Sequence, residues 1–419
     1  MTGRSGRPHP LARHARTALL ALTVVTAAAV GLATGGAAMH AVQGGGDRPD
    51  LRPPTPGTVP ASAAPLPEPA PDVLLAWTSG GLDPRLAGAA GAHPSVIGTS
   101  VVRGDVVDMV GSRDDEGRTV DDLRRGWAVP LDAVAIDPAS HAPLVPVADR
   151  ATVAALGDGE ALLGRTSANL RRLAPGAVVE LAGGRSVVVA GIVDDATIGG
   201  AELAITHPTG ERLGVRTDRY LLAFHDGDRA AVEAALREAL AGDDRRVRFR
   251  GPGETPFLRH GDGVLTQVQL KERFGEFSYR RLPGGGRDGR QFEQDPGWRA
   301  EHLVVREVPI LGRVRCHRDV IDALAGALGE LEDANLAGLV DRELFAGCWA
   351  PRLIRPGEGV SHHAWGVAVD LNYQQNRTGL DSAQDPRLVE VLARWGFTWG
   401  GDWLLPDASH FEYRGPPTA

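Results

Sequence analysis

Short apolar runs and one amphipathic stretch predict an α/β-type region in the middle of the chain. Residues 187–193 and 220–225 are rich in valine and leucine and are bounded by polar or glycine positions, which is typical of buried strands. Residues 228–240 place alanine and leucine on one side at helical spacing and so predict a helix, with Asp226 or Asp228 as its cap. No set of catalytic residue types stands out here.

The hydrophobic pattern changes again toward the C-terminus. Residues 243–261 are charged and rich in glycine and proline, which favours a domain boundary. Residues 319–337 repeat apolar positions at helical spacing and predict a core helix with Asp319 as a candidate cap. We therefore expect an accessory domain over 73–242 and a second domain over 262–415.

The N-terminus predicts export. Residues 1–16 carry arginines and no acidic residue, and residues 17–39 are uncharged and long enough for a bilayer core. The basic tail is expected in the cytoplasm and the remainder outside. The segment at 17–39 is interpreted as an uncleaved membrane anchor, with a cleaved signal peptide as the alternative. Residues 40–72 are proline-rich and predict an extended linker.

Composition narrows the function classes. A net charge of -8 and a pI near 5.9 argue against a nucleic-acid partner. Cys316 and Cys348 are the only cysteines, which excludes a disulfide scaffold and a cysteine-ligated zinc site. Because both lie in the second domain of an exported protein, they are expected to form a disulfide that braces the nearby loop.

Three side chains near the C-terminus have the pattern of a metal site. His363 and Asp370 are joined by an alternating stretch at 367–370, which predicts a strand that aims the aspartate at a fixed point. Gly366 suggests a turn or a close backbone approach just before it. His410 precedes an apolar-aromatic pair and supplies a third donor. Three such donors and an open position are what a catalytic zinc ion needs.

Further residues are candidates around these donors. Asp407 is the expected general base, because a carboxylate near the metal can take a proton from bound water and return it to a leaving amine. Asp402 is the alternative base. His362 is expected to point away from the metal, and Glu412 to orient His410 from behind.

The segments SHHAWGVAVDLN and GFTWGGDWLLPDASHFEY resemble the M15 zinc metallopeptidases, which are D-alanyl-D-alanine carboxypeptidases and L-alanyl-D-glutamate endopeptidases of peptidoglycan. The resemblance covers about Thr266 to Tyr413. It implies a small antiparallel sheet with helices, the zinc fold shared by DD-peptidases and hedgehog-like proteins, so that the whole chain is α+β. It also implies that His363, Asp370 and His410 bind Zn²⁺ and that Asp407 is catalytic.

The resemblance further implies a substrate-binding arginine and serine. Arg352 is in the matching position to bind a substrate carboxylate or steady an oxyanion, with Arg355 as a close alternative. Ser361 matches the family serine and is expected to touch substrate. Residues 161–193 resemble the extracytoplasmic domains of bacterial export permeases.

The sequence therefore predicts a membrane-anchored or secreted zinc peptidase that cuts the peptidoglycan stem peptide by metal-assisted amide hydrolysis. Two alternatives remain. One is a non-catalytic module that binds wall peptide or a partner on the same fold; the other is a permease-like assembly factor whose accessory domain carries the function, with a protein partner of its own, and whose peptidase is auxiliary. The sequence leaves open whether the enzyme is a carboxypeptidase or an endopeptidase.

Overall fold

The computed structural model describes residues 72–243, 245–254, 265–354, 359–403 and 405–416. Within these ranges, no helix combines the length and the apolar character needed to cross a bilayer. The predicted basic tail, the anchor or signal segment and the linker up to residue 71 lie outside the described residues, as does Arg355.

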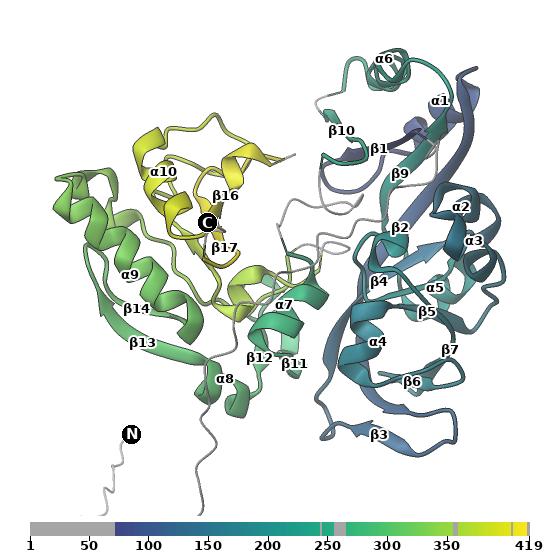
Figure 1. The fold of residues 1–419 in the computed structure, drawn as a ribbon, viewed down its shortest axis with the longest axis horizontal. Helices are drawn as coiled ribbons and strands as arrows, with labels where there is room; N and C mark the ends of the chain where they lie inside the picture. Colours follow the sequence, from purple (N-terminus) through teal and green to yellow (C-terminus); the bar gives the residue numbers. More distant parts are fainter. Residues whose placement is uncertain (1–71, 244, 255–264, 355–358, 404, 417–419) are drawn as a thin grey trace, which may run out of the picture. The chain divides into compact units, whose positions relative to one another are not determined.

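The first region is built on one large sheet (Figure 1). Its described strands are β1 (Asp72–Thr78), β2 (Val96–Arg113), β3 (Thr119–Asp122), β4 (Val129–Ile136), β5 (Glu160–Gly164), β6 (Val178–Leu181), β7 (Arg185–Val193), β8 (Leu203–Thr206), β9 (Asp218–His225) and β10 (Val247–Arg250). The long strand β2 pairs with β9, β4, β6 and β3. Because β6 also follows β4, β8, β5 and β7 in the strand order, the pairings close a ring of six strands.

Alternating apolar positions fill the inside of the ring. Along β4, β5, β6 and β8 every second residue is apolar and belongs to one buried cluster, and parts of β2 and β7 add to it, as the side-chain period of two in a strand predicts. The cluster includes Val107, Met109, Leu131, Ala133, Leu163, Val179, Val187, Val189, Leu203 and Ile205. The ring interior is therefore a packed core.

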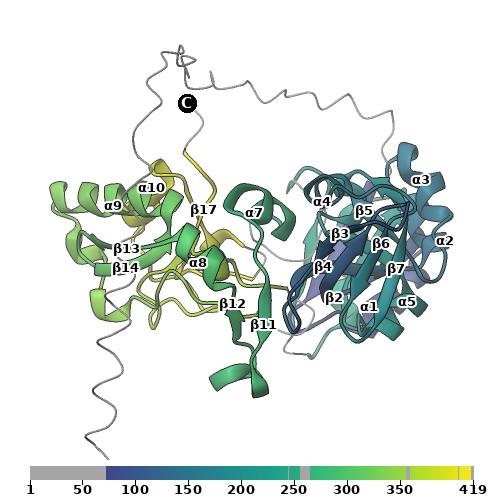
Figure 2. The ribbon, with the colours of Figure 1, turned by 90° about the horizontal axis from the view of Figure 1, so that it is seen from below.

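Helices cover the outer surfaces of this sheet. They are α1 (Pro84–Ala92), α2 (Pro138–His141), η1 (Ala142–Leu144), α3 (Val147–Ala154), α4 (Arg165–Arg171), η2 (Asp195–Ile198), α5 (His207–Leu213) and α6 (Arg229–Ala239). α1 and α6 pack together on the strands β1 and β9 through a separate apolar cluster. α2 and α3 lie together at another edge (Figure 2).

The predicted strands and helix of this region are confirmed as β7, β9 and α6, with Asp228 as the cap of α6. The α/β assignment is wrong in one respect, because most pairings among the described strands are antiparallel and only β4–β8 and β5–β7 are parallel there. Local apolar patterns predict that a strand exists, whereas its direction depends on distant partners. β10 also lies beyond residue 242 and pairs with β1.

In its described residues, the second region contains helices and three small antiparallel sheets. Its helices are α7 (Gln267–Phe274), η3 (Pro283–Asp288), α8 (Pro296–His302), α9 (Arg318–Asp333), η4 (Ala337–Leu339), η5 (Arg342–Leu344), η6 (His362–Trp365), α10 (Pro386–Arg394) and η7 (Gly400–Asp402). Its strands are β11 (Tyr279–Arg281), β12 (Phe292–Gln294), β13 (Leu303–Val308), β14 (Gly312–His317), β15 (Ala368–Asp370), β16 (Phe397–Trp399) and β17 (His410–Tyr413). They pair as β11–β12, β13–β14 and β15–β17–β16. The predicted small antiparallel sheet with helices is thus present.

The predicted core helix is α9, which buries Val320, Leu324 and Leu328 along one side. Its cap differs from the prediction. The His317 side chain accepts the amide of Asp319 through Nδ1 at 3.2 Å, so Asp319 is the first-turn acid and not the cap.

The two regions share a buried junction at α7. Val106 and Ala128 of the first region belong to the same apolar cluster as Leu270 and Phe274 of α7. The two regions therefore share part of one buried apolar cluster.

A buried ion cluster, formed by Arg171, Glu202, Lys271 and Glu276, completes this junction. Lys271, the only lysine of the chain, donates from Nζ to both carboxylate oxygens of Glu202 at 2.7 and 2.9 Å. Arg171 donates to Glu202 and to Glu276 at 2.6 Å each. The side chains of Lys271 and Glu202 are fully buried.

Candidate metal centre

Asp370 and His410 are brought together by strand pairing. β15 and β17 are antiparallel neighbours in which Asp370 lies directly opposite His410. Opposed residues on one face of such a pair have side chains close enough to interact. The Asp370 Oδ1 atom lies 2.8 Å from His410 Nδ1.

His363 reaches the same point from a short helix. It lies in η6, which ends at Gly366 with a φ of +68°, in the left-handed region that favours glycine. A Cβ atom at Gly366 would also lie 2.8 Å from the backbone nitrogen of His317. The predicted close approach at Gly366 is confirmed, and the turn directs the chain from η6 into β15.

Three potential ligand atoms converge at this point. His363 Nε2 lies 3.2 Å from Asp370 Oδ1 and 3.3 Å from His410 Nδ1, and the two other atoms are 2.8 Å apart. Two nitrogen ligands about 2.0–2.1 Å from a tetrahedral zinc ion lie about 3.3 Å apart. Among the described residues, this is the one group of histidine, cysteine or acidic side chains close enough to hold a metal ion.

The far side of each imidazole is occupied by an acceptor. His363 Nδ1 lies 2.8 Å from the carbonyl oxygen of Cys348, and His410 Nε2 lies 3.1 Å from Glu412 Oε1. Both contacts require that the outer nitrogen, Nδ1 of His363 or Nε2 of His410, carries a hydrogen. In a neutral ring the other nitrogen, which faces the cluster, then has no hydrogen and can only accept. Three lone-pair atoms then face one another, and only a cation placed among them satisfies all three.

The pKa values of His410 and Asp370 also indicate that a positive charge is favoured at this point. Burial alone would lower the pKa of His410, but hydrogen bonds with Asp370 and Glu412 outweigh it and raise the pKa to about 10. Burial alone would raise the pKa of Asp370, but the His363 and His410 rings hold it far below its usual range. Without a metal, a proton therefore takes the cationic position. The nitrogen and carboxylate donors fit Zn²⁺.

A further layer surrounds His410. The predicted contact from Glu412 is present, and Glu412 Oε1 also lies 2.7 Å from His362 Nδ1. His362 thus points away from the three ligand atoms, as expected, although it lies on η6 and not on a strand. The Trp403 ring is tilted against the His410 ring with centroids 5.0 Å apart. The contacts of His362 and Trp403 were not predicted, because neither has a local sequence signal.

Asp407 lies in the turn that leads into β17. Its backbone carbonyl accepts the amide of His410 at 3.0 Å, so the two residues share one turn. Its carboxylate accepts hydrogen bonds from Thr378 Oγ1 at 2.8 Å and Ser409 Oγ at 3.0 Å. The alternative base, Asp402, is exposed in η7.

Arg352 and Ser361 are neighbours through the backbone, since the Ser361 amide donates to the Arg352 carbonyl at 3.0 Å. Ser361 is buried and immediately precedes η6. Arg352 is half-buried, and its side chain forms no hydrogen bond or ion pair within the described part of the chain.

The predicted disulfide between Cys316 and Cys348 is confirmed, with the two Cα atoms 5.4 Å apart. It joins the C-terminal end of β14 to the segment around Cys348, whose carbonyl contacts His363.

The C-terminal segment matches a known peptidase family. A model of the M15 peptidases, described as D-alanyl-D-alanine carboxypeptidase, matches residues 355–413. That range includes His363, Asp370 and His410, so the resemblance to the M15 family is confirmed for this part of the chain. The search of the curated proteins found no match.

Two solved structures are similar to part of the chain. The periplasmic region of MacB from Actinobacillus actinomycetemcomitans is 11% identical with a TM-score of 0.30, covering 42% of this chain and 87% of that one. The extracellular domain of the noncanonic ABC-type transporter YknZ from Gram-positive bacteria is 14% identical with a TM-score of 0.26, covering 40% of this chain and 90% of that one. Similarities at these TM-scores establish neither a shared fold nor a shared function.

Proposed function

We propose that this protein is an exported zinc peptidase that hydrolyses an amide bond in the stem peptide of peptidoglycan. The observation that carries the proposal is the convergence of three acceptor atoms, from His363, Asp370 and His410, within a segment that matches the carboxypeptidase family model. The convergence supports a bound cation, and the family match supports peptide hydrolysis as its use. The N-terminal segment at 17–39 would keep the protein at the membrane or direct its secretion.

Each proposed role follows from the chemistry of the side chain. His363, Asp370 and His410 would hold Zn²⁺, which when bound polarises a carbonyl and lowers the pKa of water. Asp407 would accept the proton of the attacking water and pass it to the leaving amine. The Thr378 and Ser409 hydroxyls keep its carboxylate oriented.

Arg352 would bind the substrate carboxylate or the developing oxyanion. Its guanidinium is planar and always charged, and it forms no ion pair or hydrogen bond with a described side chain. Ser361, fixed to the Arg352 backbone, would contact the substrate beside it.

Hydrolysis of defined muropeptides tests the proposal. The purified extracytoplasmic part is incubated with and without chelator, and products are identified by mass. Loss of a terminal D-Ala would indicate a carboxypeptidase, and cleavage within the stem an endopeptidase. Zinc-dependent binding without cleavage would instead support a non-catalytic wall-binding module.

Two variants separate metal binding from turnover. Asp407→Ala is expected to retain zinc and lose about 10²–10⁴-fold in kcat, the usual contribution of a general base. His410→Ala is expected to lose both zinc and activity. Asp402→Ala serves as the matched control and should leave both unchanged; if it behaves like the expected Asp407→Ala, the base has been misassigned.

A further inference from the structure

One irregular segment, residues 346–350, is hydrogen bonded to two of the three potential ligands. The Ala346 amide donates to the Asp370 carbonyl at 3.0 Å, and the Asp370 amide donates to Gly347 at 3.3 Å. The Cys348 carbonyl lies 2.8 Å from His363 Nδ1, and the Ala350 amide donates to the His363 carbonyl at 2.9 Å. We call residues 346–350 the bracing segment.

The bracing segment has little regular structure of its own. It lies outside every helix, and its one strand-like feature is the isolated bridge between Gly347 and Asp370. Gly347 has a φ of +109°, a conformation that strains any residue with a side chain. Its position must therefore be maintained by something outside the segment.

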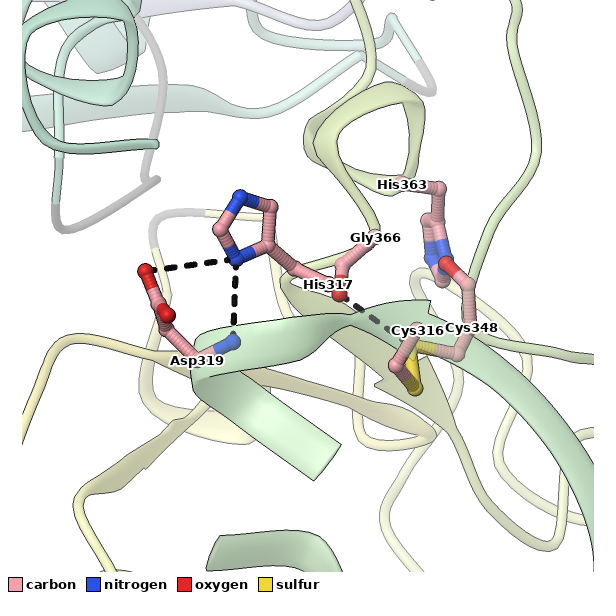
Figure 3. The surroundings of a disulfide bond; sticks show 6 residues. All are labelled: Cys316, His317, Asp319, Cys348, His363 and Gly366. Atoms are coloured by element: carbon pink, nitrogen blue, oxygen red, sulfur yellow. Dashed lines mark hydrogen bonds and ion pairs between the residues drawn. A yellow bond between two sulfur atoms is a disulfide. The ribbon is translucent and has the colours of Figure 1, made fainter. Parts of the chain in front are cut away.

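The disulfide supplies that constraint. It ties Cys348 to Cys316 at the end of β14, and both cysteines are buried. The next residue, His317, donates its amide to the Gly366 carbonyl at 2.9 Å, so the same end of β14 also holds the turn after η6. His363 is therefore constrained at two points near the disulfide: at its ring by the Cys348 carbonyl, and at the turn that follows it by the end of β14. Figure 3 shows the His363 ring beside Cys348.

We infer that the Cys316–Cys348 disulfide is a positioning element of the metal centre, which keeps the Cys348 carbonyl on His363 and the Gly347 bridge on Asp370. The inference rests on the proposed zinc site. Partners behind a metal-binding histidine fix its tautomer and orientation, and their loss typically weakens metal binding about 10–100-fold. A cross-link also lowers the number of conformations that a segment can adopt.

Removal of both cysteines tests the inference. The Cys316→Ala/Cys348→Ala double variant is used because free thiols could themselves bind zinc. Zinc affinity, measured by competition with a chromogenic chelator, is expected to fall about 10–100-fold. The visible spectrum of the Co²⁺-loaded protein is expected to lose intensity or shift, because the geometry of the donors around the ion changes.

A matched control separates positioning from general destabilisation. Val314→Ala removes buried volume from the same strand, β14, but leaves the disulfide in place. Unfolding in excess chelator gives the stability of each metal-free variant. At equal loss of stability, only the cysteine variant should lose zinc affinity and change the Co²⁺ spectrum.

A second variant tests the same segment with the disulfide intact. Gly347→Val strains the backbone at positive φ and should also weaken zinc binding. Unchanged zinc affinity and an unchanged Co²⁺ spectrum in the folded cysteine variant would overturn the inference. If the wild-type protein itself binds no zinc, the proposed function fails instead.

Discussion

Two buried charged clusters of this protein are built in opposite ways. In the ion cluster at α7, two cations meet two carboxylates, and Lys271 and Arg171 donate directly to Glu202. In the C-terminal cluster, three acceptor atoms face one another at 2.8–3.3 Å, with no donor among them when both rings are neutral. The charges of the first cluster balance one another, whereas the second cluster is balanced only by a cation from outside.

The comparison shows that a buried charged group must be interpreted together with its partners. Burial is tolerated for a charged group when its partners compensate the lost hydration. The ion cluster meets this condition with protein groups alone, and it keeps the pKa of Glu202 lowered although burial by itself would raise it. The C-terminal cluster meets this condition only with a proton or a metal ion, which supports the proposal of a metal site there.

Removing one member of the C-terminal cluster should have the largest effect. Asp370→Ala is expected to lose the zinc ion and at least about 1,000-fold in kcat/KM, because the ion contributes several kcal/mol of transition-state stabilisation. Metal analysis and muropeptide hydrolysis check this. Asp381→Ala, which removes an exposed carboxylate, is the control. Full zinc occupancy in Asp370→Ala would contradict the assignment of the cluster.

Breaking the ion cluster should lower the stability of the protein without changing its zinc affinity. Lys271→Met leaves Glu202 buried with one cation fewer, and breaking a buried pair costs about 3–5 kcal/mol. Urea unfolding measures the loss, and chelator competition is expected to show unchanged zinc affinity. Lys271→Arg, which keeps the charge, should be less destabilised. A large loss of zinc affinity in the folded Lys271→Met protein would show that the two clusters are coupled.

The sequence predicted the C-terminal cluster far better than the ion cluster. His363 and Asp370 are seven positions apart, and a turn at Gly366 and a strand bring them together by local rules. Glu412 follows from period two along β17. Lys271 and Glu202 are 69 positions apart and carry no local signal. The closed ring of strands was equally hidden, because its closure depends on the pairing of β2 with β6, which is distant in sequence.

The pH dependence of the metal-free protein should distinguish the clusters further. The folded pKa of His410, about 10, lies above its usual 6.5, so its stabilisation is complete below pH 6.5 and is lost as the pH rises through 10. In chelator, the free energy of unfolding is expected to fall by about 2–3 kcal/mol between pH 7 and pH 9.

Zinc should remove that loss, because the ion takes the place of the proton on Nδ1. The stabilisation by zinc is therefore expected to grow from pH 7 to pH 9, as measured by denaturant unfolding at fixed free zinc. Asp370→Ala lacks a hydrogen-bond partner that raises the pKa of His410, so its profile in chelator should be flatter. Equal profiles for the two proteins would show that His410 is not the titrating group.

The smallest expected effect concerns the side chains behind the ligands, Glu412 and His362. In the ion cluster, by contrast, the charged groups contact one another directly. His362 Nδ1 lies 2.7 Å from the same Glu412 oxygen that His410 contacts. Without His362, the buried Glu412 carboxylate loses a contact that favours its charged form and that holds it in place behind His410. His362→Phe is expected to weaken zinc binding about 10-fold, the lower end for such partners. His362→Gln, which can still donate to Glu412, should lose less. Complete loss of zinc in His362→Phe would make His362 a ligand, whereas unchanged affinity would confine the site to its three inner side chains.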